Sequence, residues 1–399
     1  MKAYLVHKRE ALPPFRKPAS EMRFKEGTLA ERLERQLRSA GLEVVKLDEL
    51  DASRIDPRSL VVTDDVVLSD SFFKRFLAAI PERSGSYQVE IEQGRFPLLA
   101  SRRAPQTWRK LPVFYYGDAP QRGEPRVLQL QPMPVFEFVE GLPARMQALT
   151  DICVYFFDIW GIHLAYWFDL QTASSLYCRE LVAKLIGPFH GRVPGAILSR
   201  VASSPRLMSK ANSIGRRTRI HRTAILEGCV IGDGVEIGPY AYLRSSVIAN
   251  GAVVREKSSI KMSYVGTRAF IMGSDLVNTY IGAETSIFSP MVYNAVFGER
   301  GFLSGGSGFA DFIVGAESIP ASINGKQVPS GLPFLASCVG DDCFIGANLL
   351  FAPGRSIPDG TRLLDHGLIK SVPTTPDGAY VVSGTDLVQI PSNFFRRGA

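Results

Sequence analysis

The sequence predicts an α/β domain followed by a parallel β-helix built from hexapeptide repeats. Strand and helix patterns alternate in the first half, whereas aliphatic residues recur at every sixth position after residue 225. A Ser-rich, basic stretch with Pro205 at 199–213 separates the two patterns. We therefore place the α/β domain, with a linker helix region, at 1–200, the β-helix at 211–370 and a C-terminal tail at 371–399.

Composition and charge limit the classes of function. The chain has 399 residues, of which 45% are hydrophobic and 21% charged, as in soluble globular proteins. The net charge of +7 suits a small substrate that carries phosphate. Basic blocks interleaved with aromatic residues are missing, so we expect no nucleic-acid partner.

The sequence predicts neither a secretory signal nor a membrane span. The apolar segment 154–170 has only about ten uncharged residues between its two aspartates, where a span needs ~20. We expect it to form a buried core or inter-domain helix, with His163 as a hydrogen-bonded core histidine. The five scattered cysteines are typical of thiols in a cytoplasmic protein.

The first half begins as a parallel α/β sheet. Residues 28–43 have the pattern of an amphipathic helix, with Thr28 and Glu31 at the two capping-box positions and Gly41 at the C-terminal end. Strand patterns before and after it occupy 3–9, 43–47 and 59–68, and further strands are expected at 87–93, 113–118 and 135–142.

A period of six predicts a triangular coil of three short parallel strands, in which one aliphatic side chain per strand points inward. The periodic residues are Ile225, Ile231, Ile237, Leu243; Ile248, Val254, Ile260; Val265, Ile271, Val277; Ile281, Ile287; and Val339, Ile345, Phe351, Ile357, Leu363. The segment 293–337 is rich in Gly and Ser and is predicted to leave the coil as an inserted loop. Such a loop either lies on a binding side or wraps a neighbouring subunit.

Two segments carry a family resemblance. "SSIKMSYVGTRAFIMGSDLVNTYIGAETSI" at 258–287 and "CVGDDCFIGANLLFAPGRSIPDGTRL" at 338–363 are similar to the coils of sugar-1-phosphate nucleotidyltransferases that carry a left-handed β-helix. The bifunctional UDP-N-acetylglucosamine pyrophosphorylase/acetyltransferases belong to that family. The resemblance implies a nucleotidyltransferase-like, Rossmann-like first domain, a left-handed β-helix, a homotrimer and a role in nucleotide-sugar metabolism.

The β-helix departs from the family at its catalytic base. The family has a histidine before a Leu-(Ser/Thr)-Tyr run, and in "KMSYVG" this position falls on Lys261 or Met262. A thioether accepts no proton, and a lysine does so only when its pKa is strongly lowered. Tyr264 matches the family tyrosine. Together with His221, Lys261 and Tyr264 are the catalytic candidates of this half.

The first domain departs from the family at the phosphate loop. The family's loop is rich in glycine, whereas the residues after the first strand include Pro13 and Pro14 and no glycine before Gly27. Three basic residues of this segment are the candidates for binding nucleotide phosphate: Arg16, Lys17 and Arg23. The strand at 59–68 carries the pair Asp64 and Asp65, where the resemblance places a carboxylate that holds Mg²⁺.

Three functions remain open. The first is a sugar-phosphate nucleotidyltransferase in which Mg²⁺ bridges the triphosphate and the sugar phosphate attacks. The second is a β-helix acyltransferase with acyl-CoA as co-substrate. The third is a catalytically degenerate trimer that binds a sugar nucleotide or serves as a scaffold. Each predicts a nucleotide or a sugar phosphate as the small-molecule partner.

Overall fold

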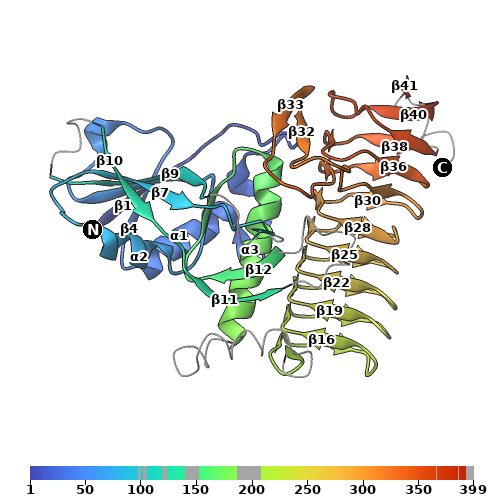
Figure 1. Ribbon diagram of the computed structural model, residues 1–399, viewed down its shortest axis with the longest axis horizontal. Coiled ribbons are helices and arrows are strands. Elements are labelled where there is room, and N and C mark those ends of the chain that lie inside the picture. The colour runs from blue at the N-terminus through green and yellow to red at the C-terminus, as the bar shows by residue number, and fades with distance from the viewer. Residues whose placement is uncertain are drawn as a thin grey trace. The chain divides into compact units, whose positions relative to one another are not determined.

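A computed structural model describes residues 1–97, 100–101, 106–118, 124–139, 152–186, 208–364, 366–384 and 386–391 (Figure 1). They form two compact units. The first holds the described residues of 1–11 and 17–165, and the second holds those of 12–16, 166–186 and 208–391. The predicted boundary at 199–213 lies largely outside the described residues.

The first unit is built on a six-stranded mixed sheet in the order β10-β7-β9-β5-β1-β4. Strand β1 pairs in parallel with β4 and β5, as the sequence pattern predicts, whereas β9 runs antiparallel to both of its neighbours. The bounds are β1 (Lys2–Val6), β4 (Glu43–Leu47), β5 (Ser59–Thr63), β7 (Tyr87–Glu92), β9 (Trp108–Tyr116) and β10 (Arg126–Leu130).

Helix α1 (Leu29–Ser39) starts where the capping box predicts. The Glu31 N–H donates to Thr28 Oγ1 at 3.3 Å, and the Thr28 N–H donates to Glu31 Oε2 at 2.8 Å. The remaining elements of this unit are η1 (Ala19–Glu21), η2 (Ala52–Arg54), α2 (Phe72–Ala79), β2 (Arg23–Phe24), β3 (Gly27–Thr28), β6 (Val66–Leu68), β8 (Ala100–Ser101), β11 (Pro134–Val139), β12 (Ile152–Phe157) and β13 (Gly161–His163).

The helix predicted at 154–170 is wrong for most of its length. This segment forms β12, which pairs with β11 and β8, and β13, which pairs with β6, and helix α3 (Trp167–Ile186) begins only near its end. Short apolar runs do not distinguish a buried helix from a strand, and the aromatic and β-branched residues here favour a strand. None of the helices in the described ranges is long and apolar enough to cross a membrane.

The second unit contains a parallel β-helix, in which each strand pairs with its equivalent one coil away. We name its three faces after one strand each. The β17 face contains β14 (Ser213–Ile214), β17 (Val230–Ile231), β20 (Val247–Ile248), β23 (Tyr264–Val265), β26 (Tyr280–Ile281), β29 (Val296–Phe297), β34 (Cys338–Val339) and β37 (Ser356–Ile357).

The β18 face contains β15 (Arg219–Ile220), β18 (Glu236–Ile237), β21 (Val253–Val254), β24 (Phe270–Ile271), β27 (Ser286–Ile287), β30 (Phe302–Leu303), β35 (Phe344–Ile345), β38 (Arg362–Leu364), β40 (Ala379–Ser383) and β41 (Asp386–Ile390). The predicted tail thus contributes two strands to this face. The β19 face contains β16 (Ile225–Glu227), β19 (Tyr242–Arg244), β22 (Ser259–Lys261), β25 (Asp275–Val277) and β28 (Met291–Tyr293). A further sheet contains β31 (Gly308–Phe309), β36 (Leu349–Phe351) and β39 (Gly367–Ile369).

Inward side chains stack from coil to coil along the axis. On the β17 face the register joins Ile231, Ile248, Val265, Ile281, Phe297, Val339 and Ile357 in one column, and all are buried. Ile237 and Ile345 lie in an equivalent column of the β18 face. The predicted β-helix is therefore confirmed, and the stacked sheets fit the left-handed form (Figure 1). Two of the predicted inward residues are wrong: Ile225 and Val277 point outward, and their neighbours Leu226 and Leu276 fill the core.

The coil continues further than the sequence pattern predicts. The predicted inserted loop, 293–337, is wrong in its first part, because 296–309 contains β29, β30 and β31. The inward residues Phe297, Leu303 and Phe309 keep the period of six, and Phe309 stacks on Phe351 with ring centroids 4.6 Å apart. The excursion is confined to 310–337, where β32 (Pro320–Ile323) and β33 (Lys326–Pro329) form a hairpin.

Helix α3 covers part of the β17 face within the second unit. Its Tyr177 ring packs edge-on against Tyr264 at 6.3 Å, and Tyr264 stacks on Tyr280 at 5.2 Å.

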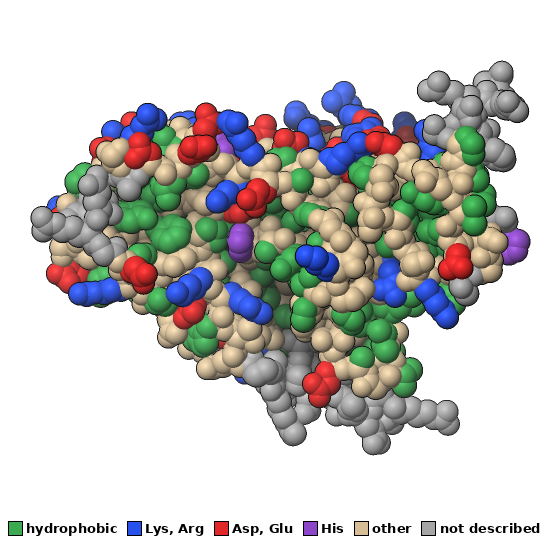
Figure 2. Space-filling view, turned by 90° about the horizontal axis from the view of Figure 1, so that it is seen from above, with side chains coloured by type: hydrophobic (Ala, Val, Ile, Leu, Met, Phe, Trp, Pro, Cys, Tyr) green, Lys and Arg blue, Asp and Glu red, His purple; other side chains and the backbone are tan. Residues whose placement is uncertain are grey.

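The face turned to the viewer in Figure 2 shows basic and acidic side chains interspersed, without an extended patch of one sign.

Candidate functional site

The outer surface of the β19 face carries two columns of outward side chains, most of which are polar. In each three-residue strand the middle residue points into the core, so that the first and third point outward. The first column is Ile225, Tyr242, Ser259, Asp275 and Met291; the second is Glu227, Arg244, Lys261, Val277 and Tyr293.

Two cations and a buried carboxylate, Glu227, occupy the middle of this face. Tyr242 donates its hydroxyl to Glu227 Oε2 at 2.9 Å, and Arg244 Nε lies 3.7 Å from the same oxygen. Burial, and then the hydrogen bond to Glu227, raises the pKa of Tyr242. Lys261 Nζ lies 5.9 Å from the centre of the Tyr242 ring. The strands β19 and β22 therefore present two adjacent cations, Arg244 and Lys261.

A carboxylate lies on the next strand. Asp275 Oδ2 accepts a hydrogen bond of 2.5 Å from the hydroxyl of Tyr293. Its second oxygen, Oδ1, is buried and has no hydrogen-bond partner among the described residues. Burial, followed by the bond to Asp275, raises the pKa of Tyr293 to about 12, so the tyrosine remains a donor at neutral pH. The arrangement leaves Oδ1 as the proton-accepting atom of this pair.

An amide network borders the carboxylate at the corner of the coil. Asn294 receives a hydrogen bond from Asn278 at 2.7 Å and donates one to Asp311 Oδ2 at 2.7 Å. Gln171 of α3 donates to Asn294 Oδ1 at 3.4 Å. Burial raises the pKa of Asp311, although the bond from Asn294 lowers it in part. The corner thereby joins α3, the β-helix and the 310–337 excursion.

These groups give the face a definite chemistry. Adjacent strands of a sheet lie ~4.8 Å apart, so Arg244, Lys261 and Asp275 span about two strand spacings. Two cations suit phosphate, and a carboxylate with an unpaired oxygen suits proton transfer from a neighbouring hydroxyl.

The predicted catalytic candidates are not brought together. Lys261 lies on the face just described, but Tyr264 is buried between Tyr177 and Tyr280. His221 is exposed after β15, where its Nδ1 lies 2.9 Å from Thr223 Oγ1. Met262 turns the corner with a φ of 50° and is buried.

Asp64 and Asp65, the carboxylate pair of the first unit, each contact the imidazole of a histidine. Asp64 Oδ2 lies 2.7 Å from His7 Nδ1, and Asp64 Oδ1 accepts from the Lys8 N–H at 2.8 Å. Asp65 accepts hydrogen bonds from Thr63 Oγ1 and, at 3.1 Å, from His163 Nε2.

All four oxygens of the pair are thus engaged, and the described residues contain no group of three or more His, Cys, Asp or Glu that could hold a metal ion. Burial raises the pKa of Asp65, but the bonds from His163 and Thr63 outweigh it, so the pKa is lowered overall. In this arrangement the pair does not fit a Mg²⁺ site, and no step is derived through the metal.

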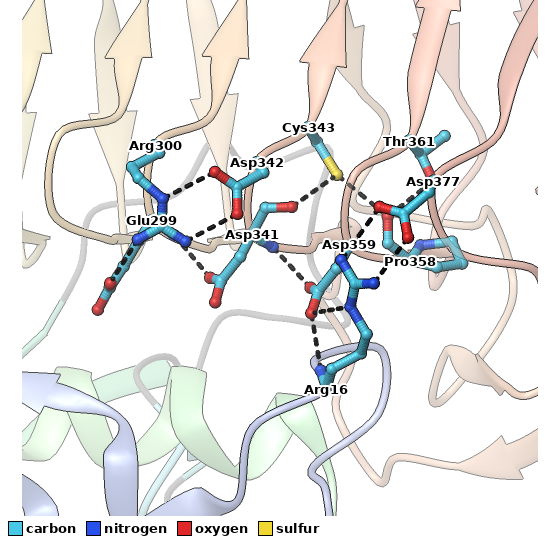
Figure 3. A network of polar contacts seen from close by, with 10 residues as sticks. All are labelled: Arg16, Glu299, Arg300, Asp341, Asp342, Cys343, Pro358, Asp359, Thr361 and Asp377. Atoms are coloured by element: carbon cyan, nitrogen blue, oxygen red, sulfur yellow. Dashed lines mark hydrogen bonds and ion pairs between the residues drawn. The ribbon is translucent and has the colours of Figure 1, made fainter. Parts of the chain in front are cut away.

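The three predicted phosphate-binding residues do not form one group. Arg16 belongs to the second unit, where its N–H donates to Asp359 at 2.7 Å and its guanidinium donates to both oxygens of Asp377, at 2.7 and 3.1 Å (Figure 3). Lys17 and Arg23 belong to the first unit, Arg23 being exposed on β2. Burial raises the pKa of Asp359, and the Arg16 N–H opposes this.

The polar network in Figure 3 continues along the same corner. Asp341 donates its N–H to Asp359 at 2.7 Å and accepts from the Glu299 N–H at 2.8 Å. Arg300 forms two bonds of 2.7 Å with Asp342. Arg16 therefore closes a chain of structural contacts in the last coils.

Sequence reasoning missed Tyr242, Arg244 and Asp275. The signal lay in their register: Arg244 and Lys261 are one coil of 17 residues apart, and Asp275 follows Ser259 by 16. Residues directly before and after the inward residue of each strand share this outer face when they are one coil apart.

Comparisons with known proteins give matches among solved structures alone. No family model and no curated protein matches the chain. The UDP-N-acetylglucosamine acyltransferase from Campylobacter jejuni is 15% identical over 45% of this chain and 79% of its own, with a TM-score of 0.27. The corresponding O-acyltransferase from Moraxella catarrhalis is 14% identical over 47% and 76%, with a TM-score of 0.22.

A polysialic acid O-acetyltransferase is 15% identical over 45% of this chain and 87% of its own, with a TM-score of 0.21. The matched proteins are thus acyl- and acetyltransferases. Scores this low carry no weight for the function of this chain, which must be argued from its own residues.

Proposed function

We propose that the protein is an acyltransferase that acylates a hydroxyl of a sugar phosphate or sugar nucleotide on the β19 face. One observation carries the proposal. Strands β19, β22 and β25 carry Arg244, Lys261 and Asp275 on one outer face, and Asp275 has a buried oxygen that no described residue satisfies. An acyl-CoA is the proposed donor.

The role proposed for each residue follows from its chemistry. Arg244 and Lys261 bind the phosphate of the acceptor. The Asp275 carboxylate takes the proton of the acceptor hydroxyl while the hydroxyl oxygen bonds to the thioester carbonyl carbon. The C–S bond then breaks, and the thiolate of CoA leaves with the electron pair and is protonated. Tyr293 donates to Oδ2, which leaves Oδ1 as the carboxylate oxygen without a hydrogen-bond partner among the described residues.

The proposal is tested by release of free thiol. The purified chain is mixed with acetyl-CoA or a longer acyl-CoA and with glucose 1-phosphate, UDP-N-acetylglucosamine or unphosphorylated glucose. We expect thiol release, and a rise in Tm on acceptor binding, with a phosphorylated acceptor but not with glucose. Acetylation of the amine of glucosamine 1-phosphate is expected to stay at background, because Lys261 or Met262 stands where the resembled family has its catalytic histidine. No thiol release with any pair would contradict transfer.

A second candidate function is binding without transfer. The outward residues of β16, β19, β22, β25 and β28 include no histidine, although the resembled family uses one as its base. A rise in Tm with a sugar nucleotide but no thiol release would select this function.

We also propose that the chain assembles as a homotrimer through the β-helix. Phe302 and Phe344 stack at 5.0 Å on the β18 face, where Phe344 and Met272, the residue after β24, are at least one-third exposed. Exposed apolar side chains on one face indicate an interface.

Light scattering should therefore give a trimer for the native chain and a monomer for Phe344→Glu. The control Val127→Glu changes an exposed residue of β10 and is expected to leave the trimer intact. A native monomer at micromolar concentration would refute the assembly.

A further inference from the structure

Three amide side chains and a carboxylate meet at one corner of the β-helix. Asn278 follows β25 and Asn294 follows β28, one coil further on, and both have a φ of 51°. Asn294 Oδ1 accepts hydrogen bonds from Asn278 Nδ2 at 2.7 Å and from Gln171 Nε2 at 3.4 Å. Asn294 Nδ2 donates to Asp311 Oδ2 at 2.7 Å. The other three side chains are therefore each one hydrogen bond away from Asn294.

The carboxylate of Asp311 fixes the orientation of all three amides. An ionised carboxylate only accepts hydrogen bonds, so the Asn294 atom that contacts it is the nitrogen. The oxygen of Asn294 is then an acceptor, and the atoms of Asn278 and Gln171 that contact it are their nitrogens. The carbonyl oxygens of these two amides consequently point away from Asn294.

Those two carbonyl oxygens are buried without a hydrogen-bond partner. Gln171 is 2% exposed and Asn278 is 7% exposed. Neither Gln171 Oε1 nor Asn278 Oδ1 has a partner among the described residues. Leaving a buried acceptor unsatisfied is costly, so both oxygens favour a ligand that supplies positive charge.

The same corner carries negative charge. The carboxylate of Asp311 is bound to an amide and that of Asp275 to the hydroxyl of Tyr293, and both of these partners are neutral. Burial, and then the bond to Asp275 and the charges of Asp275 and Asp311, raises the pKa of Tyr293, so both charges act at one hydroxyl. Carboxylate and carbonyl oxygens are the ligands that a hard metal ion prefers.

We propose that this corner is a Ca²⁺ site whose protein ligands are the carboxylate of Asp311, Asn278 Oδ1 and Gln171 Oε1. Ca²⁺ takes carboxylate and amide oxygens together in flexible geometry, whereas Mg²⁺ demands a near-ideal octahedron and usually keeps several waters. The double charge of the ion offsets Asp311 and the nearby Asp275. The site does not rest on the acyl transfer proposed above.

The ion holds the 310–337 excursion against the β-helix. Asp311 lies at the start of the excursion, and its carbonyl oxygen accepts from the Leu335 N–H, near the end of the excursion, at 2.9 Å. The other two ligands belong to α3 and to the corner after β25. One ion thus connects three elements, and its binding is expected to slow amide hydrogen exchange in 310–337.

The first test titrates the full chain, after treatment with a chelator, with CaCl₂, MgCl₂ or KCl at constant ionic strength. We expect only CaCl₂ to raise Tm, by an amount that grows with its concentration, and to slow exchange in 310–337. Tb³⁺, a luminescent ion with similar ligand preferences, should bind and be displaced by Ca²⁺. An equal rise in Tm with all three salts, or no rise with any of them, would overturn the proposal, because water would then satisfy the two carbonyl oxygens.

Variants locate the ion at this corner. Asp311→Asn keeps an acceptor for Asn294 but removes the charge, and Gln171→Leu removes a carbonyl oxygen at similar volume. Each should weaken Ca²⁺ binding at least about tenfold, because Ca²⁺ affinity depends on the charge and number of its ligands. The matched control Asp386→Asn removes an exposed carboxylate of β41 and should leave the affinity unchanged. If Gln171→Leu fails to fold, Asn278→Gly, which suits the positive φ, replaces it.

Asp275→Asn separates the ion from the acceptor site of the β19 face. It should weaken Ca²⁺ binding less than Asp311→Asn does, since Asp275 contributes charge but no ligand atom. Loss of binding in Asp275→Asn with full binding in Asp311→Asn would overturn the assignment to this corner. Thiol release is measured without Ca²⁺, so failure of acyl transfer and failure of calcium binding remain distinguishable.

Discussion

Ile345→Ala is expected to lower the free energy of unfolding by about 2–5 kcal/mol, the usual cost of truncating a buried Ile in a core. Ile345 is fully buried in the inward column of the β18 face, between Leu303 and Leu363. The neighbours on both sides are held by the backbone pairing of their own strands, so the cavity cannot close by a local shift. The measurement is urea unfolding followed by circular dichroism, at one protomer concentration because assembly adds to apparent stability.

Leu350→Ala is the matched control for this truncation. Leu350 lies on a neighbouring strand of the β-helix but is 50% exposed, so its loss should change the stability by no more than about 0.5 kcal/mol. Equal midpoints for the two variants would contradict the inward assignment of Ile345.

The β-helix was predictable because every strand must place an apolar side chain in the core, at a regular spacing along the sequence. Ile231, Ile237 and Ile357 are buried as their spacing indicates. The pattern was harder to see where aromatic residues replace aliphatic ones: Phe297 and Phe309 fill the same inward position, and Gly and Ser around them resemble a loop. At these positions the residue types indicated a loop, although the inward residues kept their spacing of six.

The first unit and the sites were less predictable because they depend on contacts between distant residues. The run 154–157 is apolar on both faces of a strand, so its sequence shows no alternation that would exclude a helix. Asp64 was recognised as a carboxylate at a strand end, but its partner His7 lies 57 positions earlier. On the β19 face, coils of 16 and 17 residues decide which side chains are neighbours, and a one-residue difference in coil length is not fixed by the hexapeptide pattern.

Asp275→Asn is expected to lower kcat for acyl transfer by about 10²–10⁴-fold, the usual contribution of a positioned general base. The change is nearly isosteric, and the carbonyl oxygen of Asn can still accept the hydroxyl of Tyr293. The amide cannot take the acceptor's proton, so transfer slows while binding persists. Steady-state thiol release with the phosphorylated acceptor measures kcat and KM, and the Tm of the variant should stay near the native value.

Lys261→Gln should instead raise KM and leave kcat nearly unchanged. Lys261 is proposed to bind the acceptor equally in the ground state and in the transition state. The loss of a charge-assisted hydrogen bond of about 1.5–3 kcal/mol raises KM by about 10–150-fold with kcat nearly unchanged. Arg219→Gln and Asp342→Asn remove one charge each from exposed ion pairs elsewhere on the β-helix and should alter neither constant. If Asp275→Asn raised KM alone, Asp275 would be a binding residue, and the proton would have to go to another group. If it lowered Tm and kcat in parallel while Lys261→Gln did nothing, the β19 face would be a structural surface rather than the acceptor site.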